Sequence, residues 1–375
     1  MFDRTNKSLF GQWWWTVDKL TLFLLAIILF IGTVLVMAAS PSIADSRGLP
    51  AFYFVQKQII FLVLSVSIMF FFSILSPVHI RRISLLGLII SILLLVVVLA
   101  FGAEVKGAKR WINFGGFNMQ PSEFVKPFMI VITAWILTLN NIRGNINGYG
   151  VSFGLWAVIV LLLIAQPNIG MTIIISTIWG AQLFLAGLPI LFVAIGAFVG
   201  VGGVVCAYFF LPHVANRINN FLDPSSGDTY QNEKALEAFV NGGLFGRGPG
   251  QGVIKDIIPD AHTDFIFAVA GEEMGLIACF IIVLLYASVL ARGFTALMKQ
   301  SDLFIIYAGS GLLMQFGLQA LINMGVSLNL LPNTGVTLPF MSYGGSSMIS
   351  MAITMGILLS FTRKRYGTMK DKNGK

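Results

Sequence analysis

The sequence predicts an all-α integral membrane protein, a polytopic bundle of about ten transmembrane helices. Hydrophobic residues make up 57% of the 375 positions and charged residues only 11%, whereas soluble domains carry about 25% charged residues. The apolar residues also gather in long runs, and a helix needs about 20 such residues to cross a bilayer. In lipid these runs must be helical, because their backbone groups find no water to bond.

Ten runs approach or meet that length. The first, 20–39, follows Arg4 and Lys7 as the core of a signal peptide would. It exceeds the roughly 7–15 apolar residues of such a core, so we interpret it as a membrane span. The others cover 59–75, 83–102, 123–139, 151–166, 168–187, 189–210, 263–290, 303–325 and 346–362.

The loops between these runs predict the orientation. Lys and Arg in the tails and short loops on one side place both termini in the cytoplasm, with an N-terminal tail over 1–19 and a C-terminal tail over 363–375. A long periplasmic loop, about 211–262, precedes the eighth helix, and its Gly and Pro residues predict irregular backbone. With no separate soluble domain, 1–375 is expected to form one membrane domain.

Composition also argues against several classes of site. Cys206 and Cys279 both lie in apolar runs, which favours small buried side chains over a disulfide or a metal site. The three histidines are widely separated, which argues against a histidine-built metal centre. The net charge of +8 follows from Lys and Arg that retain loops in the cytoplasm, so it does not call for a nucleic-acid partner.

Four stretches on the expected outer face carry residues suited to chemistry. The first holds Lys106, Lys109 and Arg110, cations that suit a phosphate or pyrophosphate group and equally suit anionic lipid headgroups. It continues to Glu123 and Lys126, which are three residues apart and therefore share a helix face. Ionisable residues at membrane depth usually face an interior or an aqueous cavity, which favours a functional role over a purely structural ion pair.

The second stretch, Gln166-Pro167-Asn168-Ile169-Gly170, is by itself compatible with a simple tight turn. The third runs from Pro259 through His262 and Asp264 to Glu272-Glu273. We expect Asp264 where the loop enters the eighth helix, a position at which a carboxylate is also an ordinary cap. The two glutamates lie about 12 Å further along that helix, where capping does not require them.

The fourth stretch, 331–347, is rich in Gly and Ser and predicts a re-entrant or interfacial loop before the last helix. Its amides and hydroxyls, among them those of Ser342, Gly344 and Gly345, could bind an anion.

Together these stretches resemble the SEDS family (shape, elongation, division and sporulation) over nearly the whole chain. Several motifs in the right order, between the right spans, are more specific than any one of them. The motifs that carry the resemblance are Lys109-Arg110-Trp111-Ile112, Gln120-Pro121-Ser122-Glu123, Tyr230-Gln231, Gly242-Gly243-Leu244-Phe245-Gly246, His262-Thr263-Asp264-Phe265-Ile266-Phe267, Pro339-Phe340 and Ser342-Tyr343-Gly344-Gly345-Ser346.

Within the family the chain is more similar to the division branch than to the elongation branch. The segments that favour this branch are 235–238, 259–262 and Thr337-Leu338-Pro339-Phe340. Two positions depart from the common pattern: Asn168 stands where an acid is usual, and Asp260 where Glu is frequent. We therefore assign no charged role to position 168.

The resemblance implies a peptidoglycan glycosyltransferase that acts on lipid II outside the bacterial inner membrane, at the division septum. It also implies a class B penicillin-binding protein as transpeptidase partner, together with other division proteins and membrane lipids. The family's essential outer-loop aspartate falls on Asp264, and its membrane acid and lysine fall on Glu123 and Lys126.

The expected reaction moves a sugar from a lipid pyrophosphate to a sugar hydroxyl, and a hydroxyl is a poor nucleophile that needs a general base. We assign that role to Asp264. A Mg or Mn ion could help to hold the pyrophosphate, although the sequence shows no dedicated metal site. The candidate cations for the pyrophosphate are Lys109, Arg110, Lys126, Arg217, Arg247 and Lys255.

Three alternatives stay open. An elongation polymerase of the same family would use the same residues. A lipid II flippase should place its key residues near the bilayer midplane and open to both sides. A non-catalytic scaffold for division proteins would leave Glu123 and Lys126 without a role.

Overall fold

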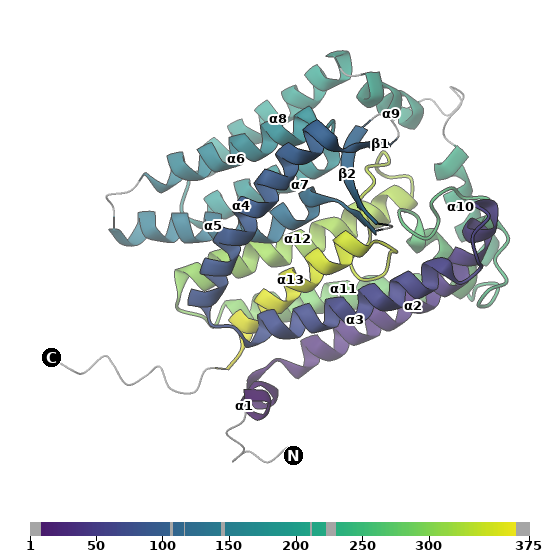
Figure 1. Ribbon diagram of the computed structural model, residues 1–375, viewed down its shortest axis with the longest axis horizontal. Helices are drawn as coiled ribbons and strands as arrows, with labels where there is room; N and C mark the ends of the chain where they lie inside the picture. Colours follow the sequence, from purple (N-terminus) through teal and green to yellow (C-terminus); the bar gives the residue numbers. More distant parts are fainter. Residues whose placement is uncertain are drawn as a thin grey trace.

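The computed structural model describes residues 9–105, 108–115, 117–143, 147–210, 212–222 and 230–364. These residues form a helical bundle in which the first and last described segments lie at one end (Figure 1). We call this the terminal end, and the opposite end the site end. The helices are α1 Leu9–Thr16, α2 Lys19–Ser46, α3 Tyr53–Ile74, α4 Pro77–Phe101, α5 Pro121–Arg143, α6 Gly148–Ala165, α7 Ile169–Leu185, α8 Ile190–Phe210, α9 Pro212–Leu222, α10 Tyr230–Gly242, α11 Ile266–Leu297, α12 Leu303–Ser327 and α13 Gly345–Thr362.

The predicted all-α membrane fold is confirmed. Among the described residues, nine helices are long and apolar enough to cross a membrane, and α7 is a shorter apolar helix of 17 residues. These ten helices correspond one to one with the predicted spans. The largest differences are in α2 and α11, which continue about seven residues beyond the predicted ends of their spans, to Ser46 and Leu297.

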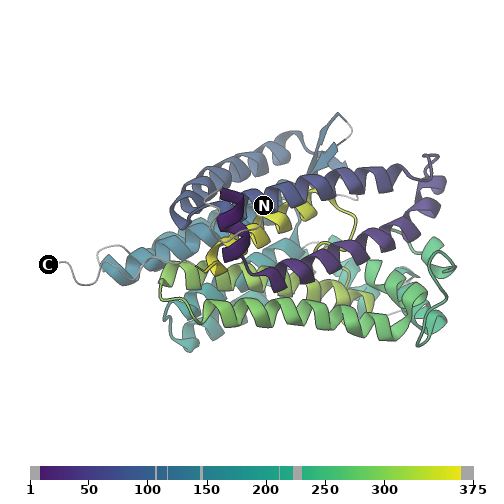
Figure 2. The same ribbon diagram turned by 90° about the horizontal axis from the view of Figure 1, so that it is seen from below.

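The ten helices differ in how much of their surface they bury. Helices α5, α12 and α13 are the most enclosed and form the centre of the bundle, whereas the described side chains of α8 face outward. Figure 2 shows the same arrangement from below, with the helices running roughly parallel. The enclosed helices carry several of the buried polar residues, among them Glu123, Lys126, Gln319 and Asn323.

The structure differs from the sequence expectation in two loops. Between α4 and α5 lies a small antiparallel sheet in the order β1 (Ala103–Val105), β2 (Ala108–Phe114) and β3 (Phe117–Met119). The loop expected to be irregular, about 211–262, contains α9, α10 and the 3-10 turn η2 (Ile254–Asp256). The sequence signal missed α10 because its apolar residues are few, and it becomes ordered by burying Ala235, Ala238 and Phe239.

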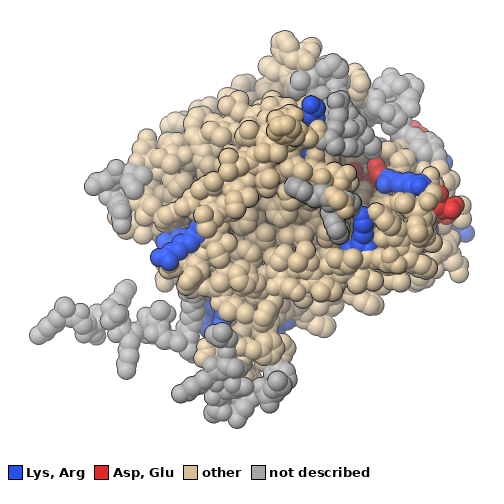
Figure 3. Space-filling view, in the orientation of Figure 1, with Lys and Arg blue, Asp and Glu red and all other residues tan. Residues whose placement is uncertain are grey.

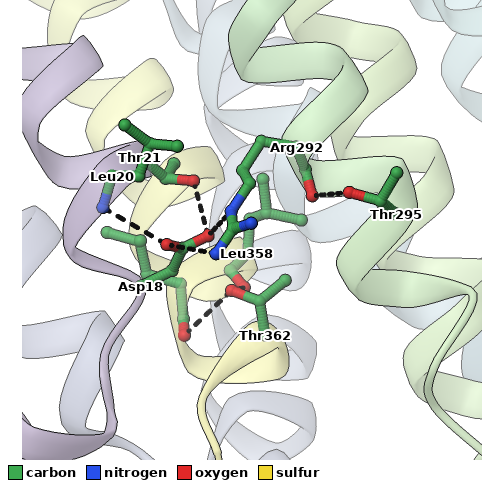
Figure 4. A network of polar contacts seen from close by, with 8 residues as sticks. Asp18, Leu20, Thr21, Arg292, Thr295, Leu358 and Thr362 are labelled. Atoms are coloured by element: carbon green, nitrogen blue, oxygen red, sulfur yellow. Dashed lines mark hydrogen bonds and ion pairs between the residues drawn. The ribbon is translucent and has the colours of Figure 1, made fainter.

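A polar network fastens the terminal end of the bundle (Figure 4). Asp18 caps α2 by accepting from the amide of Leu20, and it also accepts from Thr21 and from Arg292 of α11 at 2.8 and 3.2 Å. Burial alone would raise the pKa of Asp18, but the hydrogen bonds from Arg292 and Thr21 outweigh it and lower the pKa below its ordinary value. The amide of Lys364 donates to the carbonyl of Thr16, so the first and last described segments meet there.

Candidate active site

The four stretches singled out in the sequence meet at the site end. Arg110 of β2 donates to the carbonyl oxygens of Gln166, at 3.3 Å, and Pro167, which joins the first stretch to the second. The amide of Gln120 donates to Ser346 Oγ at 3.0 Å, which joins the first to the fourth. Segments more than 200 residues apart in sequence therefore line one region.

The second and third stretches complete this region. Gly170 at the start of α7 lies so close to the carbonyl of Thr334 that an added Cβ would stand 3.0 Å from that oxygen. The neighbouring Gly335 faces the carboxylate of Asp264, since its own added Cβ would lie 4.0 Å from Asp264 Oδ2. Gly335 has a φ of 68°, a left-handed conformation that suits glycine. The turn after α12 is thus held between α7 and Asp264.

Asp264 lies just outside α11, as the sequence predicts, but it does not cap the helix. The N-cap residue is Phe265, which makes no side-chain capping bond, and Asp264 belongs to the preceding turn through its amide, which donates to the Asp260 carbonyl at 3.1 Å. The side chain of Asp264 is half-buried. An ordinary capping role therefore does not explain the carboxylate.

Asn323 of α12 holds the backbone around this carboxylate in place. Its Nδ2 donates to the carbonyl oxygens of Asp264 and Val336, each at 2.8 Å. One buried amide thus fastens the aspartate to the start of the fourth stretch. Sequence reasoning missed Asn323, although Gln315, Gln319 and Asn323 recur every four residues in an apolar helix and so mark one polar face.

The fourth stretch is a re-entrant loop, one of the two forms that the sequence predicted. From Val336 it descends until the backbone of Phe340 and Met341 touches Gly32, in the middle of α2. Tyr286 of α11 donates to the Pro339 carbonyl at that depth. The chain then returns, and the amide of Tyr343 donates to the His262 carbonyl at 2.8 Å.

Three predicted ligands in this loop have roles inside the protein. Ser342 Oγ accepts from the amide of Leu338 at 2.8 Å, which closes the turn at the bottom of the loop. Gly345 packs directly against the ring of Phe61, where no side chain would fit. Gly344 is the N-cap residue of α13 in extended conformation.

Glu123 and Lys126 form the predicted ion pair inside the bundle. Lys126 Nζ lies 2.7 Å from Glu123 Oε2, and the two side chains are 0% and 5% exposed. The same ammonium donates to Gln319 Oε1 at 2.9 Å. Because Gln319 is four residues before Asn323 on α12, the pair lies about 6 Å deeper than the amide that holds Asp264.

Glu272 and Glu273 organise the loop that leads to Asp264. The carboxylate of Glu272 accepts from the amides of residues 253 to 255, each at 2.8 Å, and from the side chain of Asn241. Glu273 pairs with Lys255 and accepts from the amide of Gly250. These two buried carboxylates take the place of water as hydrogen-bond acceptors for the backbone amides of this irregular segment.

The structure therefore corrects the role expected for Lys255. Its side chain is 4% exposed and its ammonium pairs with the buried Glu273, so its charge is compensated inside the protein. Lys126 is likewise enclosed and paired with Glu123. Neither ammonium faces the surface at which a pyrophosphate would arrive.

The other predicted cations lie nearer the surface. Lys109 and Arg247 are exposed, and Arg110 is half-buried. Arg247 also donates to the Asn241 carbonyl at 2.9 Å, which orients its guanidinium. The side chain of Arg217 lies outside the part of the chain that the structure describes. In Figure 3 the middle of the molecule shows few charges, while basic and acidic side chains gather at the site end.

His262 is buried beside this region and is neutral at pH 7. Burial lowers its pKa to about 4, with the charge of Arg47 acting in the same direction and Asp260 opposing both. Its ring packs against Phe54 and Tyr343. Among the described residues, no group of three or more His, Cys, Asp or Glu side chains is arranged to hold a metal ion.

Comparisons with known proteins give a consistent result. The family model for FtsW, RodA and SpoVE, described as a cell cycle protein, matches residues 18–367. The probable peptidoglycan glycosyltransferase FtsW of Caulobacter vibrioides is 41% identical over 372 residues, which covers 98% of this chain and 94% of that protein. Stage V sporulation protein E of Bacillus subtilis is 34% identical, with 92% and 97% covered.

Solved structures show the same fold. A chain from a peptidoglycan synthase complex that coordinates polymerization and crosslinking matches with a TM-score of 0.75 at 28% identity, covering 92% of this chain and 97% of its own. The rod shape determining protein RodA of Thermus thermophilus matches with a TM-score of 0.69, also at 28% identity, covering 93% and 97%.

Proposed function

The chain belongs to the FtsW, RodA and SpoVE family of cell cycle proteins, and on that premise we propose that it is a peptidoglycan glycosyltransferase that polymerises lipid II into glycan strands. The observation that carries this proposal is the position of Asp264, a half-buried carboxylate at the site end that does not cap α11. The fourth stretch lies beside Asp264, and the first and second stretches contact the fourth.

The site end is proposed to face the periplasm and both termini the cytoplasm, in the bacterial inner membrane. The positions of the helices support this arrangement, because α1 and the end of α13 lie at one end of the bundle and α10 lies at the other (Figure 1). Helix α10 packs against the beginning of α11, which Asp264 directly precedes. A reporter active only in the periplasm should be active when fused near Asp228 and silent when fused after Lys370. The reverse pattern would move the proposed reaction to the cytoplasm and refute it.

In the proposed mechanism Asp264 takes the proton from the attacking sugar hydroxyl. The hydroxyl oxygen forms a bond to the anomeric carbon of the donor sugar as the bond from that carbon to the lipid pyrophosphate breaks. The pyrophosphate leaves as an anion that needs charge stabilisation rather than a proton. Lys109, Arg110 and Arg247 are the proposed contacts for that anion, because they lie nearer the surface than Lys126 and Lys255. Arg217 stays among the candidates on the sequence alone.

A divalent cation is a further proposal. Mg or Mn carried in with the pyrophosphate would stabilise the same charge as the cations of the protein. Polymerisation that survives complete chelation would exclude this part of the mechanism and leave the side chains to act alone.

The buried pair and the re-entrant loop are proposed to support the base rather than to touch the sugar. Asn323 links Asp264 to Val336, and Gln319 of the same helix links to Lys126. A rigid α12 would therefore fix the positions of the ion pair, the loop and the base relative to one another. Ser342, Gly344 and Gly345 shape the loop whose amides are proposed to line the substrate path.

The proposed cellular role is septal wall synthesis during division, with an elongation role as the alternative within the family. The FtsW name of the Caulobacter vibrioides relative supports division. A class B penicillin-binding protein is the proposed partner, since a chain of similar fold belongs to a complex that couples polymerization and crosslinking. Other division proteins and the surrounding membrane lipids complete the proposed set.

The deciding experiment is glycan synthesis by the purified chain in lipid nanodiscs supplied with lipid II, with and without the partner. Polymer that depends on Asp264 is the expected result. Transport of lipid II across vesicle membranes without polymer would instead establish the flippase. Neither activity in the presence of the partner would leave a scaffold and overturn the proposal.

A further inference from the structure

Helix α11 is longer than a bilayer requires, and its charges show which part of it crosses. The helix has 32 residues, but no charged residue lies between Glu273 and Arg292. These 18 residues, 274–291, extend about 27 Å, close to the thickness of a bilayer's hydrocarbon core of about 30 Å. The hydrocarbon boundary nearest the site therefore lies near Glu273, and the first turns of α11 project beyond it.

Near this boundary the helical hydrogen bonding of α11 is interrupted, and another segment supplies the missing hydrogen-bond partners. Gly275 leaves the helical conformation with φ 83° and ψ 173°, so the amides of Leu276 and Ile277 lose the carbonyls of residues 272 and 273. The amides instead donate to the carbonyls of Gly243 and Leu244, and the two abandoned carbonyls accept from the amides of Arg247 and Gly248. The segment 243–248 is thereby fixed against the helix at a known depth.

This docking leaves three large apolar side chains without a covering partner in the described structure. Val240 is 82%, Leu244 59% and Phe245 82% exposed, and we call these three residues the apolar tip. Their surface continues into that of α11, because Leu276 and Ile277, which bond to the same segment, are themselves 44% and 47% exposed. From there the exposed apolar face runs on down the membrane-crossing part of the helix.

We propose that the apolar tip is immersed in the acyl chains of the leaflet nearest the site, so that the segment from α10 to Gly248 is an interfacial membrane element. The depth is consistent with this role. Leu276 and Ile277 lie three to four residues beyond Glu273 along α11, about 5–6 Å into the hydrocarbon core, where interfacial elements commonly rest. An aromatic side chain so exposed to water would otherwise forfeit its burial energy.

The positive charge next to the apolar tip also fits contact with membrane lipid. Arg247, two residues after Phe245, is exposed and bonds through its amide to the Glu272 carbonyl, which places it at the boundary itself. Its guanidinium is oriented by the carbonyl of Asn241. A cation at the boundary with apolar side chains just beneath it matches an anionic lipid headgroup above its acyl chains.

The test uses site-specific fluorescence in the full chain. Cys206 is exposed and is first replaced by Ser, while the buried Cys279 is kept. A bimane label is placed at Phe245→Cys, with Val240→Cys as a second tip position and Glu233→Cys, an exposed site in the first turn of α10, as the matched control. The proteins are reconstituted in nanodiscs of phosphatidylethanolamine and phosphatidylglycerol.

Nitroxide attached high on the lipid acyl chain should quench the two tip labels about threefold more than the control label, and aqueous iodide should show the reverse order. Iodide quenching at the tip equal to that at the control would place the tip in water and overturn the proposal. Protection from both quenchers would place the tip against protein and overturn it equally. Neither outcome depends on glycan synthesis, so the result stands apart from the proposed activity.

Discussion

The Glu123–Lys126 pair offers the most quantitative test of how the bundle holds its site. The perturbation is Glu123→Gln, which preserves the size and one acceptor oxygen of the side chain but removes its charge. Lys126 is then left inside the bundle with neutral acceptors only, of which Gln319 Oε1 at 2.9 Å is the nearest described. Its side chain is 0% exposed, so the ammonium is not at the surface of the protein.

The expected cost follows from that burial. Removing one partner of a buried ion pair typically destabilises a protein by about 3–5 kcal/mol. An upper bound comes from discharging the lysine: an ordinary lysine with a pKa near 10.4 gives up its proton at pH 7 for about 5 kcal/mol, at about 1.4 kcal/mol per pH unit. We therefore expect Glu123→Gln to lose about 3–5 kcal/mol of stability and to lose polymerisation with it.

The assay is the midpoint of denaturation by sodium dodecyl sulfate in mixed micelles, read by tryptophan fluorescence, alongside polymer formation from lipid II. The matched control is the double variant Glu123→Gln with Lys126→Met, which removes both charges. Replacing a whole buried pair by neutral groups is often close to neutral for stability, so the double variant should recover most of the loss.

Two results would refute the reasoning. If the double variant is as unstable as Glu123→Gln alone, the cost comes from packing and not from an unpaired charge. If Glu123→Gln synthesises glycan at the normal rate, the pair is dispensable for the site, whatever it contributes to folding.

Three further predictions concern the surroundings of the proposed base. Asp264→Asn should reduce polymerisation by about 10²–10⁴-fold with lipid II binding retained, whereas a residue serving only as a helix cap would tolerate Asn; unchanged synthesis removes Asp264 from catalysis. Asn323→Leu removes the donor to the carbonyls of Asp264 and Val336, which should cost about 1–3 kcal/mol for each unsatisfied carbonyl. The polymerisation rate should therefore fall from the wild type to Asn323→Ser and further to Asn323→Leu. Equal rates would show that Asn323 does not position the base. His262 should make stability fall on acidification, because the unfolded chain binds a proton at the ordinary pKa of 6.5 while burial holds the folded pKa at about 4. The loss begins below pH 6.5, reaches about 2 kcal/mol at pH 5 and is complete below pH 4; thermal melts of the wild type and His262→Gln that respond identically to pH would contradict it.

Features set by neighbouring residues could be predicted from the sequence. The ten membrane helices follow from runs of apolar residues, because a backbone in lipid has no alternative to local hydrogen bonding. The Glu123–Lys126 pair follows from a spacing of three in a helix. A re-entrant or interfacial loop before α13 follows from its Gly and Ser content. Each of these features depends on residues close together in the chain.

Features that depend on distant contacts could not be read in this way. From the sequence, Lys255 was expected to be another cation on the outer face. Only the folded chain reveals its partner Glu273, 18 residues further along the chain. Helix α10 could not be predicted because it has few apolar residues. It is ordered by packing on α11. The glycines of 242–246 predicted irregular backbone, but the sequence did not show that Gly246 closely approaches the backbone of α11 at the break near Gly275.

By itself, the sequence determined the membrane class, the number and order of the spans, and the residue types able to do chemistry at one end. Only the tertiary structure decided which of these residues meet. Gln319 reaches Lys126 across 193 residues of chain, and Asn323 joins Asp264 to Val336. The reason is physical: a helix dictates which of its own residues share a face, but the partner that satisfies a buried polar group comes from whichever helix packs against that face.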